Sequence, residues 1–594
     1  MGNFSLSPSQ IVARWYGIAL VVACFGWPLI LGMPFGWLRV AWLAIAVFCV
    51  AVSVVLAQKF AHKSVVPVLS ADAPPWFLFL AATLFVAYAT RFPTTFFGDD
   101  EAIVIPSLVV AYRLAALLTW PGLTATILTL GALVLWRYKK VSSWHLWAVF
   151  LITLLSTSSI GFFHHNAETL LVRYPPMMNL AQLVSTIIGQ GEPLLMRLAN
   201  AGWTFVLALV VWYLLPTWKP HARLALGLVA CLTPLGWSYR ILLYQSSGEI
   251  VLALAVILLL SQLLSGRDGI ALYIGVTFSL WILYRPTAFA LATATVLALL
   301  LLRRKRDALE VGAIALPIGI LWCAVYILGA FQYDFLSSSS TRSFVVARPM
   351  LETLKALPEQ LTVPGLLILI IGSICIFWKR PHDRWLLALA WLFSVSYTVL
   401  HQLLTINVWY GYGRFSALLI VPLAVVTSSM VMWAKEKKCT WLTLPLIAIL
   451  VAVTPWNFVS FMQGYRSDAY QHRMERTVTG GAIPTPLPAA TEELLTHADK
   501  MIILTPSVTY LDLFIARGLI TADQRTSIVD RSRAWTPSDT SRPVLVQAPM
   551  KGRTYRTNIP ETLENRLLEA AEWAKAQPNV YERVYGEERV IIVP

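Results

Sequence analysis

Long apolar runs follow one another along most of this chain, and they restrict its fold more than any other feature. A helix needs about 20 mostly apolar residues to cross the hydrocarbon core of a bilayer. Runs of this kind centre near Val22, Ala46, Leu80, Leu128, Leu151, Leu207, Val229, Leu254, Val276, Val296, Ile318, Leu369, Leu389, Val421 and Ile447. The sequence therefore predicts a polytopic α-helical membrane protein with about fifteen transmembrane helices.

The composition agrees with this interpretation. Of the 594 residues, 57% are hydrophobic and 13% are charged, whereas a water-soluble domain has about 25% charged residues. The net charge of +15 comes from short clusters between the apolar runs. Because no basic stripe alternates with exposed aromatic residues, we expect no nucleic-acid partner.

The basic clusters also indicate how the chain is oriented. Lysine and arginine collect in the cytoplasmic loops of membrane proteins. If Arg14 is placed inside, the following clusters all fall on the inner side: Lys59 with Lys63, Arg137 with Lys139 and Lys140, Lys219 with Arg223, Arg267, Arg303 to Arg306, Lys379 with Arg380 and Arg384, and Lys435 with Lys437 and Lys438. The chain is therefore predicted to have its N-terminus inside and its C-terminus outside.

Three parts follow from the change in composition along the chain. Residues 1–460 form the predicted transmembrane domain, and residues 461–488 are a linker rich in glycine, proline and threonine. Residues 489–594 alternate strand-like and helix-like segments, which predicts a small outer α/β domain. Its predicted strands are Met501–Leu504, Val544–Gln547 and Arg589–Val593. The predicted outer loops of the transmembrane domain are 92–117, 163–195 and 331–361.

Two outer loops carry acidic residues that could act in catalysis. One holds Asp99, Asp100 and Glu101, and the other holds Glu168. Acids at a helix N-terminus are stabilised by the helix dipole, so a solvated helix cap is one interpretation. The other is a general base at the membrane surface, with a divalent metal between the carboxylates left open.

Isolated arginines lie on the same predicted side. Arg240 and Arg285 end two apolar runs, and Arg414 follows an aromatic stretch. Such side chains can extend to lipid phosphates, or they can form a site that binds a phosphate or pyrophosphate. Polar and aromatic residues near these motifs are candidate substrate ligands: His164, His165, Arg173, Tyr174, Tyr239, Glu249, Trp409 and Tyr410.

Several segments together resemble the GT-C membrane glycosyltransferases. The resemblance is to the group with the protein O-mannosyltransferases and the bacterial aminoarabinose transferase of lipid A. It covers roughly residues 90–430. The segments that carry it are Gly98-Asp99-Asp100-Glu101-Ala102, Arg173-Tyr174-Pro175-Pro176-Met177, the run from Pro234 to Glu249 with Ser238-Tyr239-Arg240, Leu283-Tyr284-Arg285-Pro286-Thr287-Ala288, and Gly413-Arg414-Phe415 before Pro422.

The resemblance implies a lipid-phosphate sugar as donor and an outer-loop Asp or Glu as the catalytic base. This chain departs from the family pattern in one respect. The family carries its acidic motif and its Pro-Pro turn on one outer loop, whereas two predicted spans separate them here. The base is therefore either in the 99–101 cluster, which we favour slightly, or Glu168.

The expected function is transfer of a sugar from a polyprenyl-phosphate donor to a hydroxyl of a glycan, lipid or protein acceptor. The donor phosphate is assigned to Arg240, Arg285 and Arg414, and no cofactor is certain. The expected location is a bacterial inner membrane, with membrane lipids around the helices and the active site facing the periplasm. The alternatives are a polymerase or ligase of lipid-linked glycans, and a transporter or flippase of such a glycan.

Overall fold

The computed structural model describes the chain in several stretches. These are residues 7–21, 23–24, 37–89, 131, 199–232, 246–285, 287–333, 354, 357, 361, 363–379, 383–404, 417–437, 501–506, 511, 520–536, 543–550, 561–585 and 588–594.

Helices fill the described part of the predicted transmembrane domain. They are α1 (Pro8–Val21), α3 (Trp37–Ala61), α4 (Trp76–Ala89), α11 (Gly202–Leu214), α12 (Pro220–Leu232), α14 (Ser246–Leu264), α15 (Ala271–Tyr284), α16 (Ala288–Leu301), α17 (Lys305–Tyr333), α19 (Val363–Lys379), α20 (Arg384–Leu404), the 3₁₀ turn η4 (Ala417–Leu419) and α21 (Ile420–Glu436). Each predicted apolar run overlaps one of these helices, except the runs near Leu128, Leu151 and Ile447, whose centres lie outside the described residues.

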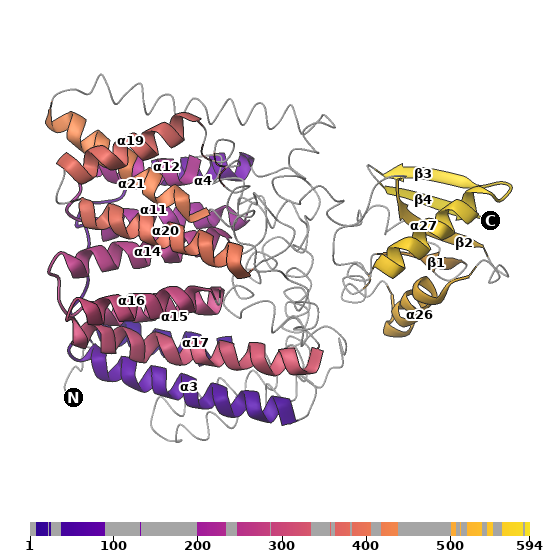
Figure 1. The fold of residues 1–594 in the computed structure, drawn as a ribbon, viewed down its shortest axis with the longest axis horizontal. Helices are drawn as coiled ribbons and strands as arrows, with labels where there is room; N and C mark the ends of the chain where they lie inside the picture. Colours follow the sequence, from indigo (N-terminus) through magenta and orange to yellow (C-terminus); the bar gives the residue numbers. More distant parts are fainter. Residues whose placement is uncertain are drawn as a thin grey trace.

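The helices lie side by side (Figure 1), and all of these α-helices except α4 contribute to one large apolar core, whereas Phe79 of α4 packs with Ala208 and Trp212 of α11 in a smaller cluster. Helix α17 packs against α3, α15 and α16, and α14 packs against α11, α15 and α20. On the far side of α11, α12 packs against α21, which in turn contacts α19. Large apolar side chains also remain exposed on outer helix faces, as at Phe77 (80%), Leu301 (84%) and Trp378 (76%). Apolar surfaces of this kind mark contact with lipid or with another protein.

One described helix segment, Ala44–Ala61, is both long and apolar enough to cross a membrane by length and composition. Shorter apolar helices of 10–17 residues occur at Trp76–Ala87, Gly202–Leu214, Gly248–Leu264, Ala271–Tyr284, Ala288–Leu301, Val363–Trp378 and Arg384–Leu400. The predicted number of about fifteen spans therefore stays a prediction.

An extended segment between α3 and α4, residues 64–75, crosses the ends of several helices, and we call it the strap. Its backbone hydrogen bonds reach the α14–α15 turn (Val65 N to Gly269 O, 2.9 Å), the side chain of Gln262 in α14 (Val68 N to Oε1, 3.1 Å) and the end of α11 (Ser70 N to Tyr213 O, 2.9 Å). The strap thereby joins α11, α14 and α15 at one end of the helical layer.

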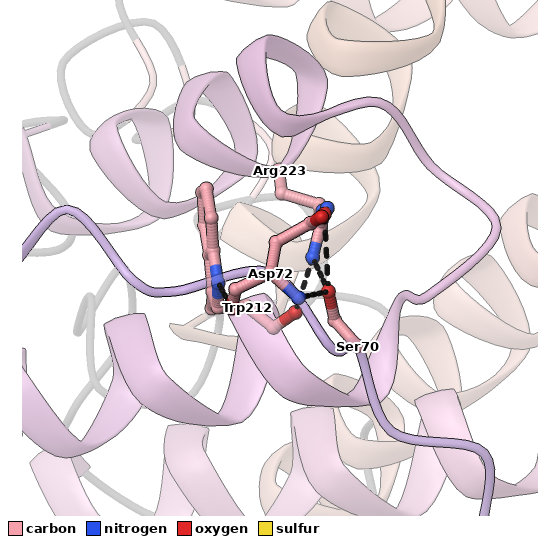
Figure 2. Close-up of polar contacts among 4 residues, drawn as sticks. All are labelled: Ser70, Asp72, Trp212 and Arg223. Atoms are coloured by element: carbon pink, nitrogen blue, oxygen red, sulfur yellow. Dashed lines mark hydrogen bonds and ion pairs between the residues drawn. The ribbon is translucent and has the colours of Figure 1, made fainter.

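A buried arginine fastens the strap to α12 (Figure 2). Arg223 is 1% exposed, and its guanidinium donates to the Asp72 carboxylate and to Ser70 Oγ. It also donates to the carbonyl of Trp212 at 2.9 Å and lies 4.4 Å from the centre of the Trp212 ring. Trp212 in turn donates through Nε1 to the carbonyl of Asp72 at 2.9 Å. A buried charge needs such a partner, because an unpaired one is strongly destabilising.

The C-terminal part contains a four-stranded sheet in the order β1-β2-β4-β3 (Figure 1). The strands are β1 (Ile502–Leu504), β2 (Val544–Pro549), β3 (Tyr581–Tyr585) and β4 (Glu588–Val593), and the helices are α26 (Ala522–Ala534) and α27 (Glu561–Lys575). Strands β1 and β2 are parallel, whereas β4 is antiparallel to both β2 and β3. Helix α27 buries Leu563, Leu567 and Ala571 against this sheet.

The sheet confirms the prediction that strands form after residue 489. The predicted strands over Met501–Leu504, Val544–Gln547 and Arg589–Val593 correspond to β1, β2 and β4. The sequence did not predict β3 or α26. The linker at 461–488 lies outside the described residues.

Replacing Asp72 with asparagine should lower the unfolding temperature of the purified protein in detergent, because it removes the charge partner of buried Arg223. The hydrogen bond from Arg223 holds the pKa of Asp72 below its ordinary value. The stabilisation is therefore complete above the ordinary aspartate pKa of about 4 and is lost as the pH falls through the lowered one. Thermal unfolding of both proteins between neutral and acidic pH measures this.

The matched control is Asp268→Asn. Asp268 pairs with Arg304, but these side chains are 78% and 22% exposed, and exposed ion pairs contribute little. An effect of Asp72→Asn at neutral pH no larger than that of the control would contradict the role given to the Arg223–Asp72 pair, in which the arginine is 1% exposed and the aspartate 55%.

Candidate functional site

The end of α15 is determined by its local sequence. The residue before a proline is disfavoured in the helical region, and Pro286 follows Arg285. Accordingly, α15 ends at Tyr284, and Arg285 is extended, with φ −151° and ψ 115°. The Arg285 N–H still donates to the carbonyl of Trp281 at 2.6 Å. The arginine side chain is thereby held at the helix end rather than along its flank.

Glu249 lies in the first turn of α14, where the helix dipole favours a negative charge. Helices α14 and α15 run in opposite directions and pack together, so Glu249 lies beside the end of α15. Arg285 Nη1 donates to Glu249 Oε2 at 3.3 Å, and Trp281 Nε1 donates to Oε1 at 3.4 Å. The two helices are therefore joined by an ion pair and by a second hydrogen bond to the same carboxylate.

A third helix completes this network. Tyr397 in α20 donates through its hydroxyl to Glu249 Oε2 at 2.7 Å. Its ring lies 5.9 Å from the Arg285 guanidinium carbon, within the range of a cation–π contact. Below the network, Phe278, Trp281 and Phe393 stack on one another, with centroids 5.9 to 6.3 Å apart. The rings of Phe278 and Phe393 keep Trp281 in place and thereby fix the distance between α15 and α20.

Gly248 makes room for another aromatic side chain beside the carboxylate. A Cβ atom at position 248 would lie 2.6 Å from Tyr284 Cζ, which is closer than real contacts allow. Tyr284 also packs edge-on against Trp203 of α11, with centroids 6.2 Å apart. The glycine therefore allows α14 and α15 to approach closely where the charged residues meet.

All four members of the network are buried. Glu249 and Tyr397 are each 1% exposed, Trp281 is 0% and Arg285 is 8% exposed. Each accepts or donates a hydrogen bond within the set, as buried charges require. Thr287, two residues after Arg285, has a buried hydroxyl without a hydrogen-bond partner among the described residues. An oriented guanidinium and a nearby hydroxyl are suited to binding an anion such as phosphate.

The structure brings two predicted site residues together. The sequence assigned Glu249 to substrate binding and Arg285 to the donor phosphate, without any contact between them, whereas they form one ion pair. The remaining predicted site residues lie outside the described residues: Asp99, Asp100, Glu101, His164, His165, Glu168, Arg173, Tyr174, Tyr239, Arg240, Trp409, Tyr410 and Arg414. Their roles stay predictions.

Sequence reasoning missed Trp281 and Tyr397. Trp281 had a usable signal, because it precedes Arg285 by four residues and so lies on the same face one turn earlier. Tyr397 had none, since it lies 148 residues from Glu249 along the chain. Its role depends entirely on how α20 packs against α14.

Metal binding was left open by the sequence. Among the described residues, no group of three or more histidine, cysteine, aspartate or glutamate side chains is placed to hold a metal ion. The acidic cluster at 99–101, which raised the question, is not among them.

Comparison with known proteins gives a likeness in fold. No protein-family model matches the chain, and no curated protein matches it. Among solved structures, the chain is similar to the crystal structure of ArnT from Cupriavidus metallidurans bound to undecaprenyl phosphate. The two are 14% identical, the match covers 88% of this chain and 98% of the other, and the TM-score is 0.45.

A likeness at this identity and TM-score carries no information on activity. The function proposed below is therefore based on the sequence motifs and on the contacts of Glu249 and Arg285.

Replacing Gly248 with alanine should displace Tyr284 and destabilise the site, with a cost of about 1–3 kcal/mol for overpacking. The matched control is Gly227→Ala in α12, where no atom of the described residues lies within 4 Å of the new Cβ, apart from the neighbouring residues and backbone of the helix itself. That change should be neutral or stabilising by up to about 1 kcal/mol, because alanine favours helix. Chemical or thermal unfolding of both variants in detergent measures the difference, and equal stability of the two would refute the close approach.

Proposed function

We propose that this chain is a GT-C-type glycosyltransferase of the bacterial inner membrane. In this proposal it takes a sugar from a polyprenyl-phosphate donor and transfers it to an acceptor hydroxyl at the periplasmic face. The observation that carries the proposal is the buried network of Glu249, Arg285, Tyr397 and Trp281, which joins two of the motifs behind the family resemblance. Those motifs are the Pro234–Glu249 run and the Leu283–Ala288 turn.

The chemistry requires a positive group where the leaving phosphate develops charge. When the acceptor oxygen attacks the anomeric carbon, the bond from that carbon to the phosphate oxygen breaks, and the electron pair leaves with the phosphate. A fixed guanidinium stabilises this charge without reorganising during the reaction. Arg285 is held in this way by Glu249 and by the ring of Tyr397, and we assign it to the donor phosphate.

Glu249 acts in this proposal through Arg285. Its carboxylate accepts hydrogen bonds from Trp281, Arg285 and Tyr397. Such contacts suit a residue that orients a guanidinium rather than one that removes a proton. The proton of the acceptor hydroxyl passes instead to an outer-loop carboxylate, in the 99–101 cluster or at Glu168. Attack opposite the leaving phosphate would invert the anomeric centre.

Substitutions at the network test the phosphate role. Loss of a preorganised charged donor reduces turnover by about 10²–10³-fold, and we expect a decrease of this size for Arg285→Gln. Because lysine cannot reproduce the planar fork of arginine, Arg285→Lys should restore only part of the activity. Transfer from a panel of polyprenyl-phosphate sugars by the purified protein measures turnover.

Tyr397→Phe removes one hydrogen bond to Glu249 and keeps the ring, so it separates orientation from charge. A lost hydrogen bond to a charged group corresponds to about 1.5–3 kcal/mol, and we expect turnover to fall about tenfold or more with the fold intact. A suitable control is Trp391→Phe on the same helix, since Trp391 donates its hydrogen bond to Ser373 and not to Glu249. Full activity of both Arg285→Gln and Tyr397→Phe would exclude the network from the reaction.

A separate set of substitutions tests which carboxylate is the catalytic base. Asp100→Asn, Glu101→Gln and Glu168→Gln are compared for sugar transfer, with donor binding measured separately. General base assistance contributes about 10²–10⁴-fold, so the variant that loses the base should lose turnover by that factor and still bind donor. Unchanged turnover in all three would rule out these residues and transfer the assignment to Asp99 or to a different site.

A further inference from the structure

A second polar cluster lies at the end of the helical layer opposite Glu249 and Arg285. Helix α12 begins there, since Arg223 in its first turn binds the strap that crosses the α14–α15 turn. Helix α21 packs against α12 and ends there with Lys435 in its last turn. The beginning of one helix and the end of another therefore lie side by side.

Two basic side chains meet at this place, and a third basic residue lies two positions before one of them in the chain. Lys435 Nζ lies 3.5 Å from His221 Nδ1, although the two residues are 214 positions apart. Lys219 immediately precedes α12 and stands two positions before His221 in the chain. Within the described part of the chain, no carboxylate forms an ion pair with any of the three, and Asp72 pairs with Arg223 and Ser70.

The contact fixes the state of the histidine. An ammonium group can only donate, so Nδ1 of His221 accepts from Lys435 and the ring carries its proton on Nε2. That Nε2 is buried and has no hydrogen-bond partner among the residues described. A buried donor without an acceptor costs about 1–3 kcal/mol, and an anion that supplied the acceptor would remove this cost.

We propose that Lys219, His221 and Lys435 form a binding site for a phosphate group. Two ammonium groups and one ring N–H supply donors without any acceptor, which matches a phosphate and not a metal ion or a neutral sugar. The N-terminal end of α12 adds the positive pole of its dipole. Such a phosphate can come from the head group of an anionic lipid or from a free phosphate, and the geometry suits both.

The test uses the full-length protein purified in detergent, with three probes: phosphatidylglycerol, phosphatidylcholine and inorganic phosphate. Lipid retention is measured by native mass spectrometry, and the shift in unfolding temperature is measured for each probe, because a ligand bound to the folded state stabilises it. We expect phosphatidylglycerol to be retained more strongly than phosphatidylcholine. Protection by inorganic phosphate as well would identify a free phosphate as a ligand, and protection by phosphatidylglycerol alone would identify the lipid.

Single substitutions test whether the phosphate group binds at these three residues. Lys219→Gln and Lys435→Gln, both at exposed positions, should each weaken retention of phosphatidylglycerol or phosphate roughly fivefold, since one basic residue near a lipid surface contributes about 1 kcal/mol. His221→Gln should also weaken it, because it removes the ring N–H at Nε2 that is assigned to the phosphate. The matched control is Lys305→Gln, an exposed lysine at the start of α17, which should bind as the wild type does.

Two results would overturn the proposal. One is equal loss in Lys305→Gln and in the site variants, which would mean a diffuse attraction to all basic residues at this end. The other is unchanged retention in every variant, or no preference of the wild type for any phosphate-bearing probe. These readouts need no sugar transfer, so they are independent of the proposed enzymatic function.

Discussion

A buried guanidinium requires a partner, and two such groups organise the described helices. Arg223 and Arg285 are 1% and 8% exposed, and each donates to a carboxylate from a different part of the chain. Either charge would be strongly destabilising in an apolar layer if its carboxylate were removed. The positions of Asp72 and Glu249 relative to the helices are therefore restricted by these ion pairs.

The two pairs lie at opposite ends of the same helices and have different roles. At one end Arg223 anchors the strap, so that α11, α12, α14 and α15 are tied together by backbone and side-chain hydrogen bonds. At the other end Arg285 is oriented by Glu249 and Tyr397. Rigid helices fixed at one end are a suitable scaffold for a charged site at the other, because a site on packed elements keeps its geometry.

Much of the fold could be predicted from the sequence because it follows from local properties. Apolar runs indicated the helices, and alternation of strand-like and helix-like segments indicated β1, β2 and β4. Strand β3 was missed because Tyr581, Glu582, Arg583 and Val584 are all exposed at a sheet edge and show no buried face. Helix α26 was missed because its sequence is mostly polar, although the capping box of Thr521 and Gln524 was a readable signal.

The candidate site, like the fold, could be predicted from the sequence only in part. The sequence by itself determined that α15 ends before Arg285, because Pro286 disfavours a helical conformation there, and that Glu249 lies in the first turn of a helix, where a negative charge is favoured. Only the tertiary structure determined that these charges pair and that Tyr397, 148 residues from Glu249, completes the network. Helix ends depend on neighbouring residues in the chain, whereas the partner of a buried charge depends on which helix faces pack together, and no local pattern specifies that.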